Sequence, residues 1–238
     1  MKSVKGLAAI VILALLVSLP STSYGEGAAE GGAEGAASVS LMSSYVWRGQ
    51  EIHNDTAIQP TIEVGASGYS VNLWADYNVD TSEVVETDFT FDFSNSVDKI
   101  GYSVGYIFYA FDGAPDTQEI YGTVSYDTLL SPSVGLYWDY DETDSLFINL
   151  AVGHDFAVGA YTVTAGASLG YYSYNNAEND WQNFELSLST AIPVGPFSVD
   201  PSVAYSVDLY DGTGKTNAGA IAPADDELYG GVTLAYSF

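Results

Sequence analysis

The feature that most constrains this chain is a side-chain alternation of period two that runs from Ala37 to the C-terminus. About twelve segments of roughly ten residues alternate apolar with small or polar side chains, and turn residues separate them. The ending GGVTLAYSF shows the pattern, with apolar Val232, Leu234, Tyr236 and Phe238 at every second position. Such alternation places one set of side chains on each face of a strand. Helical spacing is nowhere sustained, so an all-β domain is predicted over residues 37–238.

The first 25 residues have the layout of a secretory signal peptide. Lys2 and Lys5 form a basic head, residues 7–19 are an apolar core, and Ser23 and Gly25 make a small-residue cleavage site. The core is shorter than the about 20 residues of a spanning helix, and a retained membrane anchor is the alternative. Residues 26–36 (EGAAEGGAEGA) have no apolar face and are expected to form a flexible Gly/Ala/Glu leader.

Charge and cysteine content exclude several classes of protein. After cleavage, Arg48, Lys99 and Lys215 face 31 acidic residues, so the net charge is −28. Nucleic acid is excluded as a partner because binding phosphates needs a basic surface. The chain has no cysteine, which excludes both a lipoprotein anchor and disulfides in this exported protein. Hydrogen bonds and packing must therefore hold the fold.

The connections between segments alternate in length. Short joints such as Ser67-Gly68 alternate with longer loops such as residues 50–56 and 211–225. Tyr and Trp stand at both ends of the apolar faces, for example in the pairs Tyr45 and Trp47, Tyr69 and Tyr77, and Tyr161 and Tyr171. These features indicate a transmembrane antiparallel up-and-down β-barrel of about 12 strands with aromatic girdles. A β-sandwich is the alternative, but its inner face would be large and apolar rather than rich in Gly, Ser, Thr and Asp.

The chain ends inside a predicted strand. In a closed barrel the last strand pairs with the first, so residues 228–238 are expected beside residues 39–47. The terminal Phe238 also resembles the signal that the barrel-assembly machinery reads on bacterial outer-membrane proteins. Proline cannot donate to a strand ladder, so Pro201 is expected to cause a β-bulge.

Two stretches carry a family resemblance: SVSLMSSYVWRGQEI (residues 38–52) and AIQPTIEVGASGYSVNLWADY (residues 57–77). They resemble the TorF-type porins of Gram-negative bacteria, which begin with an SxYxxRG strand, nearby Pro and Gln, and a GxY…W strand. The matching positions are Ser43, Tyr45, Arg48, Gly49, Gln59, Pro60, Gly68, Tyr69 and Trp74. Pro60 departs from the usual glycine, and Thr61 and Glu63 make the start of that strand unusual. The resemblance implies a twelve-stranded outer-membrane pore of undefined substrate.

Catalytic and metal sites are not expected. His53 and His154 are the candidate general bases, and the topology places them at opposite ends of the barrel, so no enzyme activity is predicted. The acidic loops at residues 112–116, 141–144 and 225–227 lack the spacing of a dedicated Ca²⁺ loop. Their expected partners are water and the divalent cations that bridge lipopolysaccharide at the outer-membrane surface. No cofactor is predicted.

The lumen carries the functional prediction. The inward face is expected to hold Arg48, Asp76, Asp88, Asp92, Glu119, Asp127, Asp139, Glu185, Asp200 and Asp208. A ring of charges of the same sign biases which ions pass through a pore. The sequence therefore predicts a Gram-negative outer-membrane porin for small solutes with a cation preference. The alternative is a closed structural barrel with acidic partner-binding loops, whose lumen is plugged by Trp74, Tyr109, Tyr121, Tyr137 and Phe147.

Overall fold

The computed structural model describes residues 33–175, 179–209 and 226–238. These residues form strands throughout: β1 (Glu34–Met42), β2 (Tyr45–Trp47), β3 (Gln50–His53), β4 (Ala57–Ala66), β5 (Tyr69–Asn78), β6 (Glu83–Val97), β7 (Ile100–Phe111), β8 (Thr117–Tyr126), β9 (Ser133–Asp139), β10 (Ser145–Val158), β11 (Tyr161–Tyr174), β12 (Asp180–Thr190), β13 (Ile192–Val194), β14 (Phe197–Asp208) and β15 (Glu227–Ser237). Across this part of the chain, no helix is long and apolar enough to cross a membrane.

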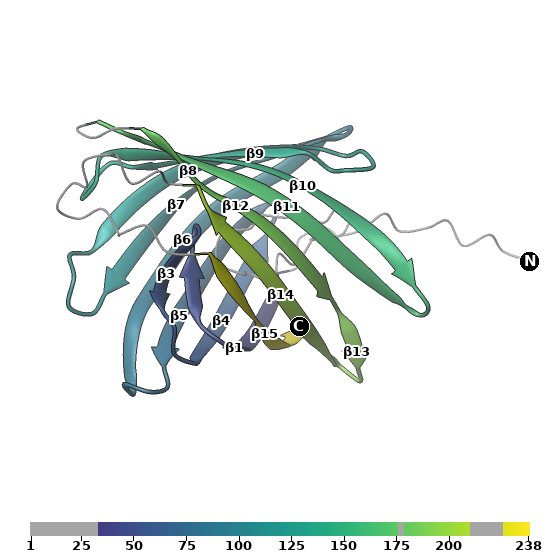
Figure 1. The fold of residues 1–238 in the computed structure, drawn as a ribbon. Coiled ribbons are helices and arrows are strands. Elements are labelled where there is room, and N and C mark those ends of the chain that lie inside the picture. The colour runs from purple at the N-terminus through teal and green to yellow at the C-terminus, as the bar shows by residue number, and fades with distance from the viewer. Residues whose placement is uncertain (1–32, 176–178, 210–225) are drawn as a thin grey trace, which may run out of the picture.

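Twelve of the strands close into an antiparallel barrel. Each consecutive strand from β4 to β12 pairs with its neighbour, β1 lies between β4 and β15, and pairing of β12 with β14 completes the ring. Figure 1 shows these strands curving steeply around one axis. The short β13 continues the line of β12 and pairs with β14, while β2 and β3 pair only with each other. The predicted all-β barrel of about 12 strands is confirmed.

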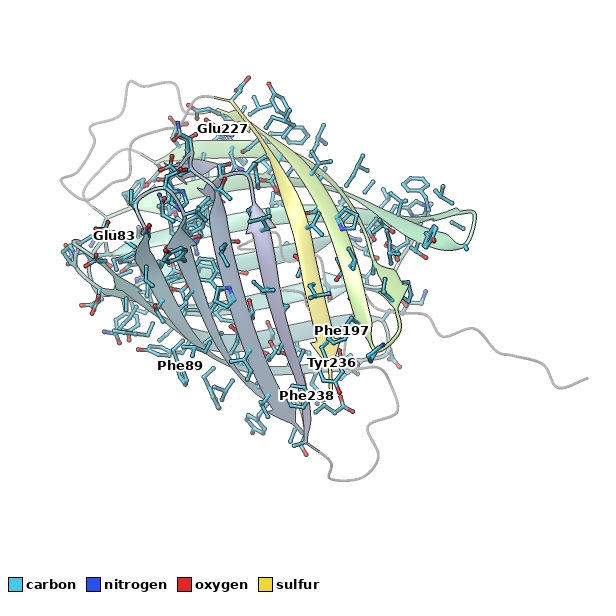
Figure 2. All side chains as sticks on the ribbon, turned by 90° about the horizontal axis from the view of Figure 1, so that it is seen from below. Glu83, Phe89, Phe197, Glu227, Tyr236 and Phe238 are labelled. Carbon is cyan, nitrogen blue, oxygen red and sulfur yellow. The ribbon has the colours of Figure 1, made fainter. Side chains whose placement is uncertain are left out.

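Side chains alternate between the two faces of the wall. On β5, Val71 and Leu73 are exposed on the outside, whereas Asn72 and Trp74 are buried inside. Figure 2 shows side chains projecting from the outer surface around the barrel, with Phe89 of β6 among them. An apolar outer face with a polar inner face is the arrangement that lipid selects.

The last strand closes on the first, as predicted. β15 pairs with β1 from Ala36 opposite Ser237 to Met42 opposite Gly231. The Gly35 and Phe238 backbones exchange two hydrogen bonds of 2.8 Å, so the terminal residue is itself paired. The expected limits of the first strand were wrong, however. β1 begins within the segment predicted to be a leader and ends before Tyr45.

The aromatic residues at the chain end lie together on the outer surface (Figure 2). The rings of Phe197 and Tyr236 are 5.4 Å apart, and those of Tyr236 and Phe238 are 6.0 Å apart. Phe238 is 59% exposed and the other two are also exposed. This cluster fits one interfacial girdle, as the sequence predicted for the terminal residue.

Pro201 interrupts a ladder without shifting its register, so the predicted bulge was wrong. Pairing between β12 and β14 stops at Ser189 opposite Ser202, and β13 resumes in the same register with Ile192 opposite Val199. The missing N–H of the proline thus opens a gap rather than an insertion. Pro60 leaves a similar gap between β4 and β5, again with no change of register.

Candidate functional site

Residues 45–53 form a hairpin, which we call the lumen hairpin, that is separate from the barrel wall. Its strands β2 and β3 are joined by Arg48 and Gly49, whose φ angles are +52° and +78°. Two positive φ angles match the two-residue turns that suit the right-handed twist of a hairpin. A Cβ on Gly49 would also collide with the Asn183 side chain on β12. Glycine is therefore required here both by its positive φ angle and by this close approach.

The lumen hairpin overturns the prediction that Tyr45 and Trp47 belong to the outer girdle. Tyr45 is 2% exposed and donates a 2.8 Å hydrogen bond to Glu86 of β6. The Trp47 ring lies 6.0 Å from the Tyr109 ring of β7. The period of two is the same in a short hairpin strand as in a barrel strand, which is why alternation alone misplaced both residues.

Arg48 crosses to the far wall of the barrel. Its Nη1 and Nη2 atoms donate hydrogen bonds of 2.8 and 2.7 Å to the two carboxylate oxygens of Glu119 on β8. Nη1 also donates a 3.1 Å bond to the Tyr172 hydroxyl on β11. The Arg48 and Glu119 side chains are only 1% and 3% exposed. The hairpin therefore spans the lumen from β1 and β4, which flank it in sequence, to β8 and β11.

Aromatic rings surround the same guanidinium. Its central carbon lies 4.2 Å from the Trp47 ring centroid, 4.4 Å from Phe147 and 5.1 Å from Tyr137. Burial by itself lowers the pKa of Arg48, but the adjacent Glu119 carboxylate raises the pKa by more, to well above its usual range. Arg48 thus stays charged, held by one carboxylate and a shell of aromatic faces.

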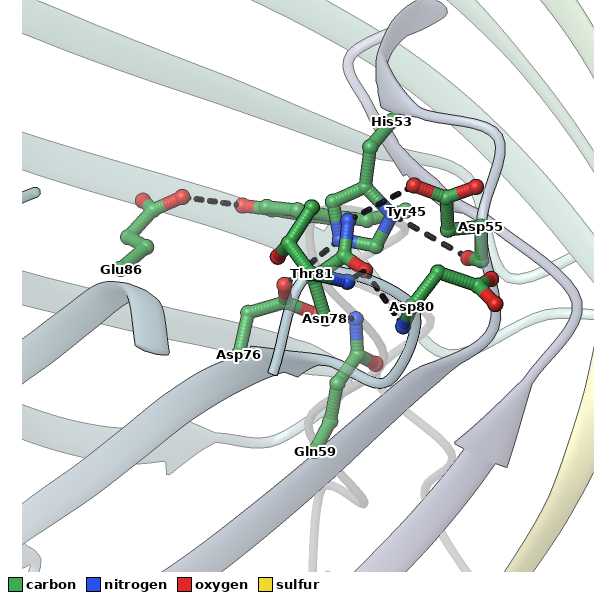
Figure 3. A network of polar contacts seen from close by, with 9 residues as sticks. All are labelled: Tyr45, His53, Asp55, Gln59, Asp76, Asn78, Asp80, Thr81 and Glu86. Atoms are coloured by element: carbon green, nitrogen blue, oxygen red, sulfur yellow. Dashed lines mark hydrogen bonds and ion pairs between the residues drawn. The ribbon is translucent and has the colours of Figure 1, made fainter. Parts of the chain in front are cut away.

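A second network anchors the base of the hairpin (Figure 3). His53 Nε2 lies 2.7 Å from Asp76 Oδ2, and Gln59 Nε2 donates a 2.9 Å bond to the other oxygen of Asp76. Nearby, Asn78 donates to Asp55 and accepts from the backbone of the following loop. Burial, with Glu86 as a further contribution, raises the pKa of Tyr45 well above its usual range. The Tyr45 hydroxyl therefore remains a donor to Glu86.

The predicted lumen residues divide into four groups. Five carboxylates are buried on the inner face: Asp76, Asp88, Glu119, Asp139 and Glu185. Three are half-buried on that face: Asp92, Asp200 and Asp208. Asp127 follows β8 in an exposed turn and so lies off the inner face of the wall. Arg48 enters the lumen from the hairpin rather than from a barrel strand.

Glu86 is a lumen carboxylate that the sequence analysis missed. It is 3% exposed and lies on β6 two residues before Asp88, on the same face. The alternation that identified Asp88 would have identified it too. One oxygen of Asp88, Oδ1, is buried without a hydrogen-bond partner. The acidic character of this part of the lumen is therefore stronger than the sequence analysis indicated.

The aromatic residues proposed as a plug line the barrel interior. Trp74, Tyr109, Tyr137 and Phe147 are each at most 6% exposed, and Tyr121 is half-buried. Tyr137 and Phe147 also contact Tyr172 in one buried cluster. Tyr172 was not among the predicted lumen residues, although its position on the alternating face of β11 would have placed it in the lumen.

The two histidines lie far apart in the topology, as expected. His53 is bonded to Asp76, while His154 is near the short-turn end of β10, where its Nδ1 lies 2.7 Å from the Leu129 carbonyl. Within the described part of the chain, no group of three or more His, Cys, Asp or Glu side chains is placed to hold a metal ion. Asp225, from the last acidic loop, lies outside the described residues.

Solved structures with a similar fold are outer-membrane proteins. An outer membrane channel from Pseudomonas putida F1 aligns with a TM-score of 0.52 and 9% identity, covering 87% of this chain and 96% of that one. A loop-deletion mutant of OmpT from Vibrio cholerae gives 0.41 and 8%, covering 87% and 99%. An anion-selective porin from Comamonas acidovorans gives 0.35 and 10%, covering 87% and 99%. The likeness to the Pseudomonas channel supports the outer-membrane barrel fold.

A family relationship comes from sequence. No protein with a curated description matches this chain. A bacterial family described as being of unknown function, Gcw_chp, matches residues 26–221, which include most of the barrel and the whole lumen hairpin. The chain therefore belongs to the Gcw_chp family of bacterial proteins.

Proposed function

We propose that this protein is a porin-like channel of the Gram-negative outer membrane that passes small solutes and prefers cations. The TorF-type resemblance and the predicted signal peptide support this location, and the closed barrel with an apolar outer face supports the channel. The proposal assigns no catalytic step to the chain. Lipid and lipopolysaccharide are its expected surroundings, and the C-terminal strand is its expected contact with the barrel-assembly machinery.

The observation that supports the cation preference is the excess of acidic over basic side chains in the lumen. Arg48 is the one Lys or Arg side chain that the described residues place inside, and Glu119 already neutralises it. Buried Glu86, Asp88, Asp139 and Glu185 also face the lumen, and the ion pairs found among the described residues join none of these four to a basic side chain. Charges in a narrow, partly desolvated lumen are screened less than on an open surface. The potential inside is therefore negative, which attracts cations and repels anions.

The test is the reversal potential of single channels in a planar bilayer under a KCl gradient. We expect cation selectivity in the wild-type protein and a weaker preference in Asp92→Asn/Asp200→Asn. These two carboxylates are half-buried on the inner face, and they accept hydrogen bonds from Tyr121 and Ser198, neither of which lies on the lumen hairpin. An asparagine oxygen can still accept the bond that the plug residue Tyr121 donates to Asp92. Asp127→Asn removes an exposed turn carboxylate of the same charge and is the matched control. Anion-selective current, or equal selectivity in all three proteins, would contradict the proposal.

The packing around the lumen hairpin favours a second candidate, a closed barrel that acts through its acidic loops. Tyr45 and Trp47 of the hairpin pack against the buried rings of Trp74 and Tyr109, and the Arg48 guanidinium lies against the buried Phe147 ring. A closed barrel would pass no current even when the hairpin is removed. A channel narrowed by the hairpin would conduct more without it. Conductance of a hairpin-deleted protein thus separates the two candidates.

A further inference from the structure

The pocket around the Arg48 side chain has the features of a receptor for a free guanidinium ion. Glu119 presents both carboxylate oxygens in line with two guanidinium nitrogens, at 2.7 and 2.8 Å. The Tyr172 hydroxyl accepts a further bond, and the faces of Phe147 and Tyr137 lie 4.4 and 5.1 Å from the guanidinium carbon. A carboxylate that binds two nitrogens and aromatic faces that attract a cation recognise planar guanidinium groups.

The residues that form this pocket lie on strands of the barrel wall, whereas Arg48, which occupies it, lies on the lumen hairpin. Glu119, Tyr137, Phe147 and Tyr172 stand on β8, β9, β10 and β11, which form one continuous antiparallel ladder. In that ladder Tyr137 is directly opposite Phe147, and Phe147 is directly opposite Tyr172, so the three rings make one row. The lumen hairpin has no ladder pairing with these strands. The pocket therefore keeps these four residues in place when Arg48 leaves it, and only the Trp47 ring moves with the hairpin.

Arg48 occupies the pocket at a conformational cost. It is a non-glycine residue with φ +52°, at a turn position where Asn, Asp and Gly are preferred. The hairpin that carries it has only three residue pairs and an irregular register, and isolated two-stranded hairpins are marginally stable. The Arg48 Nε atom is buried without a hydrogen-bond partner. Such local penalties at a buried charged residue are typical of functional sites.

An empty pocket would leave the Glu119 carboxylate buried without a counter-ion. Glu119 is 2% exposed and otherwise accepts one hydrogen bond, from the Tyr109 hydroxyl. A buried charge that loses its partner is strongly unfavourable, so the pocket favours any cation of suitable shape over vacancy. Neutral solutes cannot compensate the carboxylate, and anionic solutes are repelled by it.

We propose that this pocket binds small solutes that carry a guanidinium or amidinium group, and that Arg48 is an internal ligand which these solutes displace. The inference rests on the proposed function in one respect, that the solute reaches the pocket through the lumen. Displacement of Arg48 detaches the tip of the lumen hairpin from β8 and β11. The solute would thereby loosen the contact between the lumen hairpin and the far wall of the barrel.

The test uses the folded protein in detergent and a charged and a neutral probe of the same shape. In Arg48→Ala, ethylguanidinium should raise the unfolding temperature and bind at least about tenfold more tightly than N-ethylurea, which cannot pair with a buried carboxylate. The wild-type protein should need a higher ethylguanidinium concentration for the same shift, because Arg48 competes. Arg48→Met keeps an apolar stem against Trp47 and Phe147 and serves if the alanine variant does not fold.

Arg48→Ala/Glu119→Gln is the control, and it should lose the preference for the charged probe. Equal stabilisation of Arg48→Ala by both probes, or an unchanged preference in the control, would overturn the proposal. Binding in detergent requires no conduction. A protein that binds ethylguanidinium but shows no cation-selective current would therefore retain this site and refute the proposed channel instead.

Discussion

Substitution of Glu119 by glutamine should destabilise the folded barrel by an amount typical of a broken buried ion pair. The variant keeps the size of the side chain and removes its charge. It leaves the Arg48 guanidinium buried among Trp47, Tyr137 and Phe147 with no counter-ion. The glutamine can preserve one of the two short hydrogen bonds through its carbonyl oxygen but not both.

The magnitude follows from the burial of the pair. Both side chains are at most 3% exposed, so solvent cannot replace the lost carboxylate. Removing one partner of a buried ion pair costs about 3–5 kcal/mol, and the hydrogen bond that glutamine keeps places the expected loss at ~3 kcal/mol. In Arg48→Met/Glu119→Gln both charges are absent. Because the double variant leaves no buried charge without a counter-ion, it should recover most of this loss.

The assay is urea unfolding of the protein refolded into lipid vesicles, followed by tryptophan fluorescence. Urea is chosen because guanidinium chloride would supply a ligand for the same pocket. Refolding should be checked by heat-modifiable migration on gels before each titration. If Glu119→Gln unfolds within about 0.5 kcal/mol of wild type, as exposed substitutions do, then Arg48 does not cross the lumen to β8.

Two further predictions concern the barrel itself. Leu73→Arg should cost about 2–4 kcal/mol in the vesicle unfolding assay because it places a charge in lipid, whereas Asn72→Arg should cost much less; equal tolerance would invert the assignment of the two faces. Deletion of residues 236–238 should block assembly, since it removes the reciprocal Gly35 and Phe238 backbone bonds and exposes the edge of β1 in lipid. Normal heat-modifiable migration of the truncated protein would show that these residues are dispensable for closure.

The barrel could be predicted because its signal is repeated along the chain. Alternation on every strand fixes which residues face lipid, and Asn72 and Leu73 lie on the faces that it indicates. The alternating loop lengths fix an even number of strands, so the first strand begins and the last strand ends on the same side. Closure then requires β15 to meet β1, whichever residues bound the first strand.

The lumen hairpin could not be placed by the same reasoning. Tyr45 and Trp47 alternate as outward-facing residues of a barrel strand would, and only the contacts with Glu86 and Tyr109 put them inside. The local signal for a hairpin was present, since Arg48 and a glycine separate two short alternating runs. The position of this hairpin inside the barrel could not be predicted, because its partners on β8 and β11 become neighbours only after the barrel closes.

The carboxylates show an intermediate case. The side-chain alternation placed Asp88 on the inner face, where it is buried, and would have placed Glu86 there too. It could not distinguish one inner carboxylate from another. Glu119 differs from the rest because the hairpin brings Arg48 to it, a contact between residues 71 positions apart. Long-range partners of this kind decide which lumen charges are neutralised and which remain free to act on ions.

The central claim, that the lumen hairpin narrows a conducting barrel, is tested most directly by removing it. Met42 and Ala57 are directly opposite each other in the β1–β4 ladder, so residues 43–56 can be replaced by Asn-Gly, the favoured two-residue hairpin turn. Single-channel recording in planar bilayers should then show a larger conductance than wild type, with cation selectivity retained by the wall carboxylates. A correctly folded variant whose conductance equals that of the wild-type protein would contradict the claim.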